Sequence, residues 1–195
     1  MILDEQLFRN YNELADMILQ GYQDVAILNS FEQMRKNQDK FPETVKGVAN
    51  HFIVLCQKDL ALTIWKIKLD TNPNANTVSQ FRGKIGQELR KSDPTAGRIK
   101  KYNLDSTLET ELTNMRKRYL AHTDMTRGDS KIKISELESA LNGIRGEFNA
   151  TCSVIDDDRV QQITEGEIAR VNIGTGIGMN TIFHKGLDEN YSSDL

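Results

Sequence analysis

Apolar residues recur at intervals of three and four along most of this chain, a spacing that places them on one face of an α-helix. The first such stripe consists of Leu3, Leu7, Tyr11, Leu14, Ile18, Tyr22 and Val25. Gly21 lies within this segment and either divides it into two helices or is tolerated inside one. Because the same periodicity returns in the segments that follow, the sequence predicts an all-α protein.

A second long helix is expected to begin at Pro42, because proline fits the first turn of a helix and little else within one. Its apolar residues form two stripes: Val45, Val48, Phe52, Leu55 and Leu62, and Ile53, Cys56, Leu60, Ile64 and Ile67. A helix that is apolar on two faces is covered by neighbours on both. This segment is therefore predicted to be the central helix of a bundle.

Three shorter helices follow, each introduced by the capping-box pattern of Ser or Thr with Glu or Gln three residues later. The three pairs are Thr77 with Gln80, Ser106 with Glu109, and Ser135 with Glu138. The helical periodicity stops after about residue 155. We therefore expect an antiparallel helical bundle in residues 1–155 and an acidic, glycine-containing C-terminal tail, irregular or with short β structure, in residues 156–195.

The chain carries a formal net charge of −3 that is unevenly distributed. Residues 82–101 include seven basic and two acidic residues, whereas residues 156–195 include three basic and eight acidic ones. The basic stretch is either a binding surface for an anionic partner such as RNA or a solvated surface. If it binds RNA, its candidate contacts are Arg98, Lys100 and Lys101.

No uncharged apolar run of about 18 residues is present, which argues against a membrane protein. The N-terminus lacks the basic flank and apolar run typical of a signal peptide. The two cysteines are too few for a disulfide framework or a cysteine-based zinc site. We therefore expect a cytoplasmic protein that does not bind a membrane and needs neither a metal nor a cofactor.

One helix late in the chain carries residues suited to chemistry. His122 continues the apolar stripe that begins at Leu108, where a histidine is most often a hydrogen-bonded core residue, but Arg116, Lys117 and Arg118 lie beside it. Burial and neighbouring cations both disfavour the charged imidazole, so we expect a lowered His122 pKa. A neutral imidazole can take a proton from a hydroxyl while a guanidinium holds a phosphate, which is the minimum requirement for metal-free RNA cleavage.

The string Arg-Lys-Arg-Tyr-Leu-Ala-His-Thr-Asp at residues 116–124 resembles the Arg-X5-His signature of HEPN-domain proteins, most of all the abortive-infection group of the Abi U type. The resemblance implies an antiparallel helical bundle and a metal-independent endoribonuclease with a composite site in a homodimer. It also implies a role in phage defence or a toxin–antitoxin system, with an antitoxin protein as a further partner. It assigns catalysis to Arg116 and His122.

The sequence departs from this family at Lys117, where an Asn or Asp is usual. An ammonium group cannot accept a hydrogen bond. Lys117 therefore either adds a phosphate contact or marks a chain that has kept the fold and lost the activity. Asp124 is either the missing acceptor or an ordinary helix-terminus residue, and Tyr119 either stacks on a base or packs in the core.

The choice of arginine is left open by helix geometry. Arg116 lies roughly 120° around the helix from His122, whereas Arg118 lies one turn away on the same side. The family motif favours Arg116 and the geometry favours Arg118. A two-fold axis along this helix would set each motif against its twin, so we expect a homodimer with His122 near the axis.

The sequence thus predicts an endoribonuclease that cleaves RNA by attack of the 2′-hydroxyl, leaving a 2′,3′-cyclic phosphate and a 5′-hydroxyl. The alternative is a non-catalytic helical adaptor that keeps the fold and binds RNA or an acidic protein through residues 116–118. Only the enzyme hypothesis predicts that His122→Ala abolishes an activity while leaving the fold intact.

Overall fold

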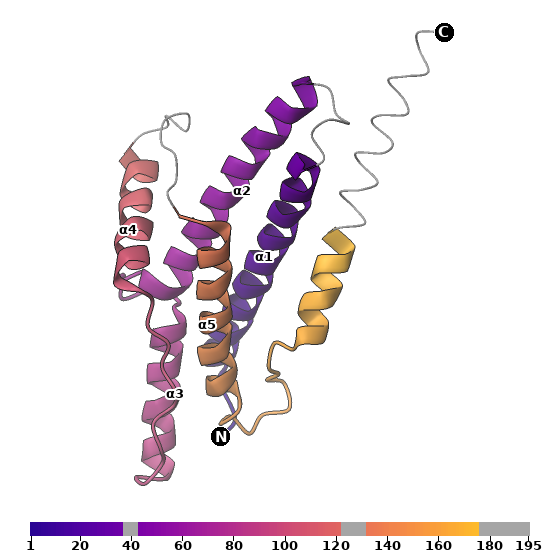
Figure 1. Cartoon of the computed structure of the whole chain (residues 1–195). Coiled ribbons are helices and arrows are strands. Elements are labelled where there is room, and N and C mark those ends of the chain that lie inside the picture. Colours follow the sequence, from indigo (N-terminus) through magenta and orange to yellow (C-terminus); the bar gives the residue numbers. More distant parts are fainter. Residues whose placement is uncertain (37–42, 122–131, 176–195) are drawn as a thin grey trace.

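The computed structural model describes residues 1–36, 43–121 and 132–175, and all regular structure in these ranges is helical (Figure 1). A further helix spans residues 165–175. The prediction of an all-α protein is therefore confirmed for this part of the chain. Five helices have labels in Figure 1: α1 (Glu5–Lys36), α2 (Glu43–Leu69), α3 (Val78–Ser92), α4 (Ser106–Ala121) and α5 (Ile134–Cys152).

Helices α1, α2 and α5 pack together around the main hydrophobic core. Helix α1 runs antiparallel to both α2 and α5, and α4 packs on the side of α2 that faces away from α1 (Figure 1). Helix α3 packs against α5 and α1, and its Phe81 stacks on Phe148 of α5. The predicted stripe of α2 that contains Leu60, Ile64 and Ile67 is fully buried at these residues. The other predicted stripe is less well covered, since its Phe52 is 46% exposed.

Helix α1 is unbroken at Gly21. A Cβ atom at this position would lie 3.1 Å from both methyl groups of Leu141 in α5. Glycine is therefore used here for a close approach between α1 and α5, and not to end a helix.

The predicted cap at Thr77 is confirmed, because its hydroxyl accepts the backbone N–H of Gln80 at 3.1 Å. The predicted cap at Ser106 is wrong, since the Asp105 carboxylate accepts the backbone N–H groups of Thr107 and Leu108 instead. Aspartate is at least as good a cap as serine, and here it precedes serine by one residue.

The predicted cap of α5 is also displaced by one or two residues. The helix begins at Ile134, and the carboxylate of Glu136 accepts the backbone N–H of Lys133 at 2.9 Å. The bond uses Glu136 where the sequence pattern had indicated Glu138. All three helices nevertheless begin within two residues of the predicted positions.

The prediction of an irregular or β-containing tail is wrong for residues 165–175, which are helical. Thr164 and Glu167 form a reciprocal capping box: the Thr164 hydroxyl accepts the Glu167 N–H at 3.2 Å, and the Glu167 carboxylate accepts the Thr164 N–H at 2.7 Å. Ile163 and Ile168 on either side of the cap are buried in the core. Residues 176–195 lie outside the described ranges.

The segment that precedes this helix is bound to the start of the chain. The Tyr11 hydroxyl donates to the carbonyl of Gln161 at 3.0 Å and accepts its N–H at 2.9 Å. Asp157 accepts the N–H of Leu3, and Arg159 donates to the Leu3 carbonyl. The division into residues 1–155 and 156–195 stays a prediction, but part of the second segment packs on the bundle.

None of the helices in the described ranges is both long enough and apolar enough to cross a membrane.

Candidate functional site

Helix α4 presents one face to the bundle and the other to solvent. Leu112 is fully buried, and Leu108 and Met115 pack against the core. The apolar stripe predicted for this helix is thus confirmed as far as Met115. The side chain of Tyr119 lies outside the described part of the structure, as do His122 and Asp124 altogether, so their predicted roles stay predictions.

The Arg116 side chain is half-buried between α4 and α2. Its guanidinium carbon lies 4.1 Å from the centre of the Trp65 ring in α2, within the range of a cation–π contact. No acidic side chain forms an ion pair with Arg116 among the described residues. Stacking holds the plane of a guanidinium while leaving the N–H groups at its edge available to an anion. The contact between Trp65 and the motif was not predicted from the sequence.

Lys117 and Arg118 are both exposed, on the turn of α4 that leads to His122. The end of α4 therefore presents three cations, one oriented by an aromatic ring and two solvated. These positions leave the choice between Arg116 and Arg118 open, because His122 lies outside the described residues.

The basic loop, residues 93–105, lies at the other end of α4. Its predicted RNA contacts Arg98, Lys100 and Lys101 are all exposed. The loop leads into Ser106, and Arg118 is twelve residues further along the helix, about 18 Å along its axis. The loop and the motif are thus separate basic sites, and an RNA strand that touches both must follow α4.

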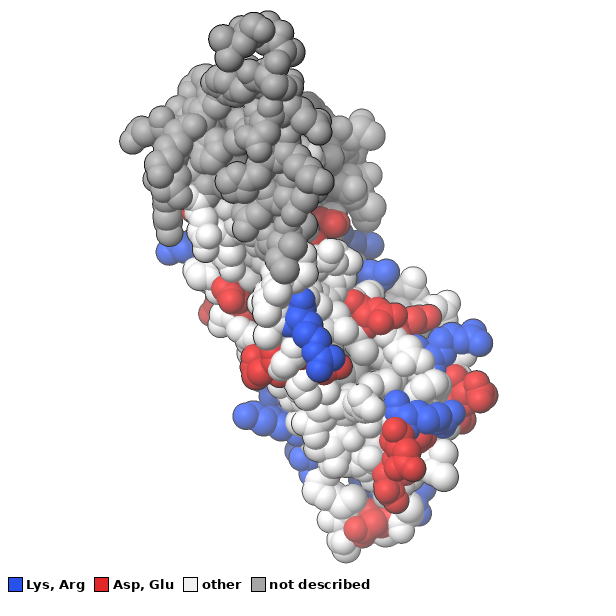
Figure 2. Space-filling view, turned by 90° about the vertical axis from the view of Figure 1, so that its right-hand side faces the viewer, with Lys and Arg blue, Asp and Glu red and all other residues white. Residues whose placement is uncertain are grey.

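Charges on the face that carries α1 and residues 165–175 are mixed. Figure 2 shows this face, on which basic and acidic side chains alternate in the described part, without a large area of one sign. Mixed charge of this kind is typical of a solvated surface. The candidate site lies on α4, at the other side of the molecule in Figure 1.

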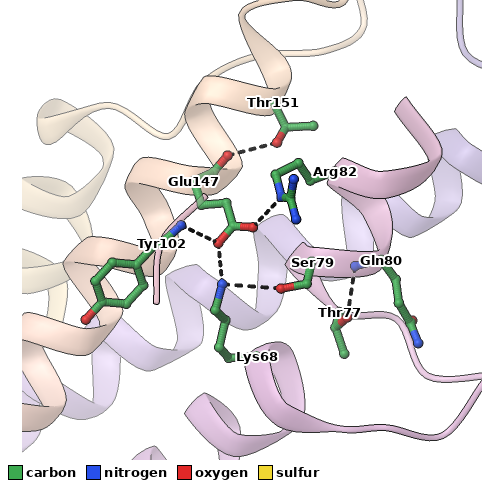
Figure 3. A network of polar contacts seen from close by, with 8 residues as sticks. All are labelled: Lys68, Thr77, Ser79, Gln80, Arg82, Tyr102, Glu147 and Thr151. Carbon is green, nitrogen blue, oxygen red and sulfur yellow. Dashed lines mark hydrogen bonds and ion pairs between the residues drawn. The ribbon is translucent and has the colours of Figure 1, made fainter. Parts of the chain in front are cut away.

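A buried ion cluster joins α2, α3, α5 and the basic loop (Figure 3). At its centre is Glu147 of α5, whose side chain is fully buried. One carboxylate oxygen accepts a hydrogen bond from Nε of Arg82 in α3 at 2.8 Å. The other accepts Nζ of Lys68 in α2 and the backbone N–H of Tyr102 in the loop, the latter at 3.0 Å. The Lys68 ammonium also donates to the hydroxyl of Ser79.

Lys68 is unusual because an ammonium group is rarely buried. Burial lowers its pKa, and the hydrogen bond and charge of Glu147 oppose that effect. Lys101 and Arg82 lie close enough to lower the Lys68 pKa further by repulsion. The cluster thus contains more positive than negative charge.

The loop is fitted to α5 at Tyr102. A Cβ atom at Gly143 would lie 2.3 Å from the Tyr102 ring, so only glycine permits this contact without a shift. The Lys68 ammonium lies 5.7 Å from the centre of the same ring. At Tyr102, the basic loop is therefore attached to the bundle by a backbone hydrogen bond, a ring contact and a cation–π contact.

Sequence reasoning missed this cluster, although a signal was present. Glu147 follows Ile144 by three residues and precedes Thr151 by four, so it lies in register with the buried face of α5. Lys68 likewise follows the buried Ile64 by four residues. A charged residue in the apolar register of a helix requires a buried partner of opposite charge.

For a second buried carboxylate, Asp24 of α1, no cation is among the described groups that shift its pKa. Gln20 donates to its Oδ1 at 3.2 Å, while its Oδ2 has no hydrogen-bond partner within the described ranges. Burial raises the pKa of Asp24 to about 6, the hydrogen bond from Gln20 lowers it, and repulsion by Asp59 of α2 adds to the rise.

The described residues contain no group of three or more His, Cys, Asp or Glu side chains that could hold a metal ion. Because His122 and Asp124 lie outside these ranges, the expectation of a metal-free site stays a prediction.

No family model, no curated protein and no solved structure matches this chain. The resemblance to HEPN-domain proteins therefore depends on residues 116–124 alone.

Proposed function

We propose that this chain is a HEPN-like, metal-independent endoribonuclease in which His122 is the general base and Arg116 stabilises the reacting phosphate. The observation that carries the proposal is the Arg116 guanidinium, which is held on Trp65 at 4.1 Å and has no acidic partner within the described part. An arginine used only for stability is usually paired with a carboxylate or a carbonyl. An oriented, unpaired guanidinium suits an anionic ligand.

In the proposed reaction, His122 takes the proton of the RNA 2′-hydroxyl, and the resulting oxygen attacks the adjacent phosphorus. The bond from phosphorus to the 5′-oxygen breaks, that oxygen takes up a proton from water, and the imidazolium of His122 releases its proton to the solvent. The products are a 2′,3′-cyclic phosphate and a 5′-hydroxyl. Arg116 donates hydrogen bonds to the phosphoryl oxygens, on which negative charge increases in the transition state.

The neighbouring residues have supporting roles in this proposal. Lys117 and Arg118 attract the RNA backbone, Tyr119 stacks on a base, and Asp124 accepts a hydrogen bond from His122 or Arg116. A homodimer with His122 near its axis would let Arg116 of one chain serve His122 of the other. The role in phage defence or in a toxin–antitoxin pair, with an antitoxin protein as partner, belongs to the same proposal.

The test is incubation of the purified chain with end-labelled RNA in excess EDTA. We expect cleavage to continue, and the products to carry 2′,3′-cyclic phosphate ends. Cleavage that stops in EDTA and returns with Mg²⁺ would contradict the mechanism. Binding of RNA or of an acidic protein without any cleavage would favour the non-catalytic adaptor.

A further inference from the structure

Two cations pair with one carboxylate where the basic loop meets α3 and α5, and a third cation lies near one of them. Glu147 pairs with Lys68 and Arg82, and Lys101 lies close enough to Lys68 to lower its pKa. Among the described residues, Glu147 is the only acid that shifts the Lys68 pKa, and Asp105 lies close enough to Tyr102 to raise the pKa of that residue. Lys68 and Arg82 thus outnumber the one carboxylate with which they pair, and Lys101 adds positive charge near Lys68, which leaves the cluster able to accept an anion.

Arg82 offers free hydrogen-bond donors to such an anion. Its Nε donates to Glu147, while its Nη1 and Nη2 groups have no hydrogen-bond partner in the structure described here. The Arg82 side chain is 24% exposed, whereas those of Lys68 and Glu147 are 5% and 0% exposed. Of the two paired cations, Arg82 is thus the one that solvent reaches.

Lys101 is held beside the cluster by its neighbour in the chain. The N–H of Tyr102 is bonded to Glu147, and the Tyr102 ring packs on Gly143. These contacts fix the backbone next to Lys101, whose own side chain is exposed. An exposed lysine on a fixed backbone loses less freedom on binding than one on a free loop.

We propose that Arg82 and Lys101 form a phosphate-binding subsite, distinct from the motif on α4, that binds one phosphodiester of an RNA strand. Lys68 supplies positive charge from behind, and Glu147 is a positioning residue that orients Arg82 through its Nε. The identification of the ligand as RNA rests on the proposed function. Because the subsite lies at the opposite end of α4 from the motif, it increases RNA affinity and takes no part in bond cleavage.

The test is fluorescence anisotropy of a labelled oligouridylate, measured over a range of salt concentrations in the His122→Ala background. Arg82→Gln and Lys101→Gln should each weaken binding and reduce the slope of log affinity against log salt by about 0.7, the value for one phosphate contact on a single strand. Since both residues bind the same phosphate, the double variant should lose less than the product of the two single losses.

Matched controls separate this subsite from general charge. Lys84→Gln and Arg90→Gln each remove an exposed cation from α3. Both should affect binding less. Arg82→Lys tests the free Nη groups directly, because a lysine can keep the ion pair with Glu147 but has no second nitrogen. We expect near-normal stability and a loss of RNA affinity.

In the enzyme with His122 intact, the Arg82 and Lys101 variants should raise KM several-fold and leave kcat unchanged. If the Arg82 and Lys101 variants cleave RNA with an unchanged KM, or lose no more RNA affinity than the two control variants, the subsite is overturned and the proposed function still stands. A chain that neither cleaves nor binds RNA, but binds tripolyphosphate in an Arg82-dependent manner, would support the phosphate subsite and overturn both the nuclease and RNA as its ligand.

Discussion

Replacing Glu147 with Gln should destabilise this protein more than the loss of one ordinary hydrogen bond. The carboxylate receives three donors: the Lys68 ammonium, the Arg82 guanidinium and the N–H of Tyr102. A glutamine of nearly the same size keeps one acceptor oxygen and presents an NH₂ group in place of the other. At least one of these donors then loses its acceptor, and the cluster has no negative charge left.

The expected cost follows from burial. Breaking a buried ion pair by removing one partner costs about 3–5 kcal/mol, because the other charge stays buried without compensation. Here Lys68 is 5% exposed at its side chain, so solvent cannot replace the lost charge without local opening. For a chain of this size, such a loss corresponds to a decrease in Tm of roughly 6–20 °C.

The measurement is urea unfolding followed by circular dichroism at 222 nm, with the free energy of unfolding compared between the wild type and Glu147→Gln. The control is Glu88→Gln, which removes an exposed ion pair with Lys91 in α3. That change should cost less than about 0.5 kcal/mol. A loss below about 1 kcal/mol in Glu147→Gln would refute the view that this cluster holds α2, α3 and α5 together.

Three further predictions concern other sites. Gly143→Ala should destabilise the fold by about 1–3 kcal/mol, because its Cβ would lie 2.3 Å from the Tyr102 ring. Gly146→Ala, which meets no atom within 4 Å, should not destabilise it in the same urea titration. Asp24 has a folded-state pKa of about 6, above its ordinary 3.8, so its contribution to stability is present at low pH and is lost as the pH rises through 6. Asp24→Asn should therefore raise the free energy of unfolding by about 1–2 kcal/mol at pH 8 and by less at pH 4, and an equal effect at both pH values would contradict this reasoning. Replacing Arg98, Lys100 and Lys101 together by Gln neutralises the basic loop, and it should weaken RNA binding and reduce the slope of log affinity against log salt. An unchanged slope would show that the loop is only a solvated surface.

The helices were predictable because their signals are local. Apolar spacing identifies α1, α2, α4 and α5, and the hydroxyl of Thr77 marks the start of α3. The role of Gly21 was not predictable, since its close approach to Leu141 depends on how α1 meets α5. The helix at residues 165–175 was missed although its capping pair, Thr164 and Glu167, follows the same rule as Thr77.

The candidate site was predictable only in part, because its contacts join distant segments. Residue type and spacing selected Arg116, but its partner Trp65 lies on another helix, 51 positions earlier in the chain. Glu147 likewise contacts Lys68, which lies 79 positions earlier in the chain, and Arg82, which lies 65 positions earlier. Periodicity along one helix reports which face is buried, and it carries no information about which charged residues meet across that face.

The central claim is that His122 performs chemistry, and the most direct measurement is RNA cleavage by His122→Ala next to the wild type in EDTA. We expect the variant to lose cleavage by at least about 100-fold, the usual contribution of a general base, with an unchanged circular dichroism spectrum and unchanged mass in solution. Arg116→Ala should lose activity in the same way, and Arg118→Ala should lose less. Equal cleavage by wild type and His122→Ala, in preparations free of contaminating ribonuclease, would contradict the assignment of His122 as the general base.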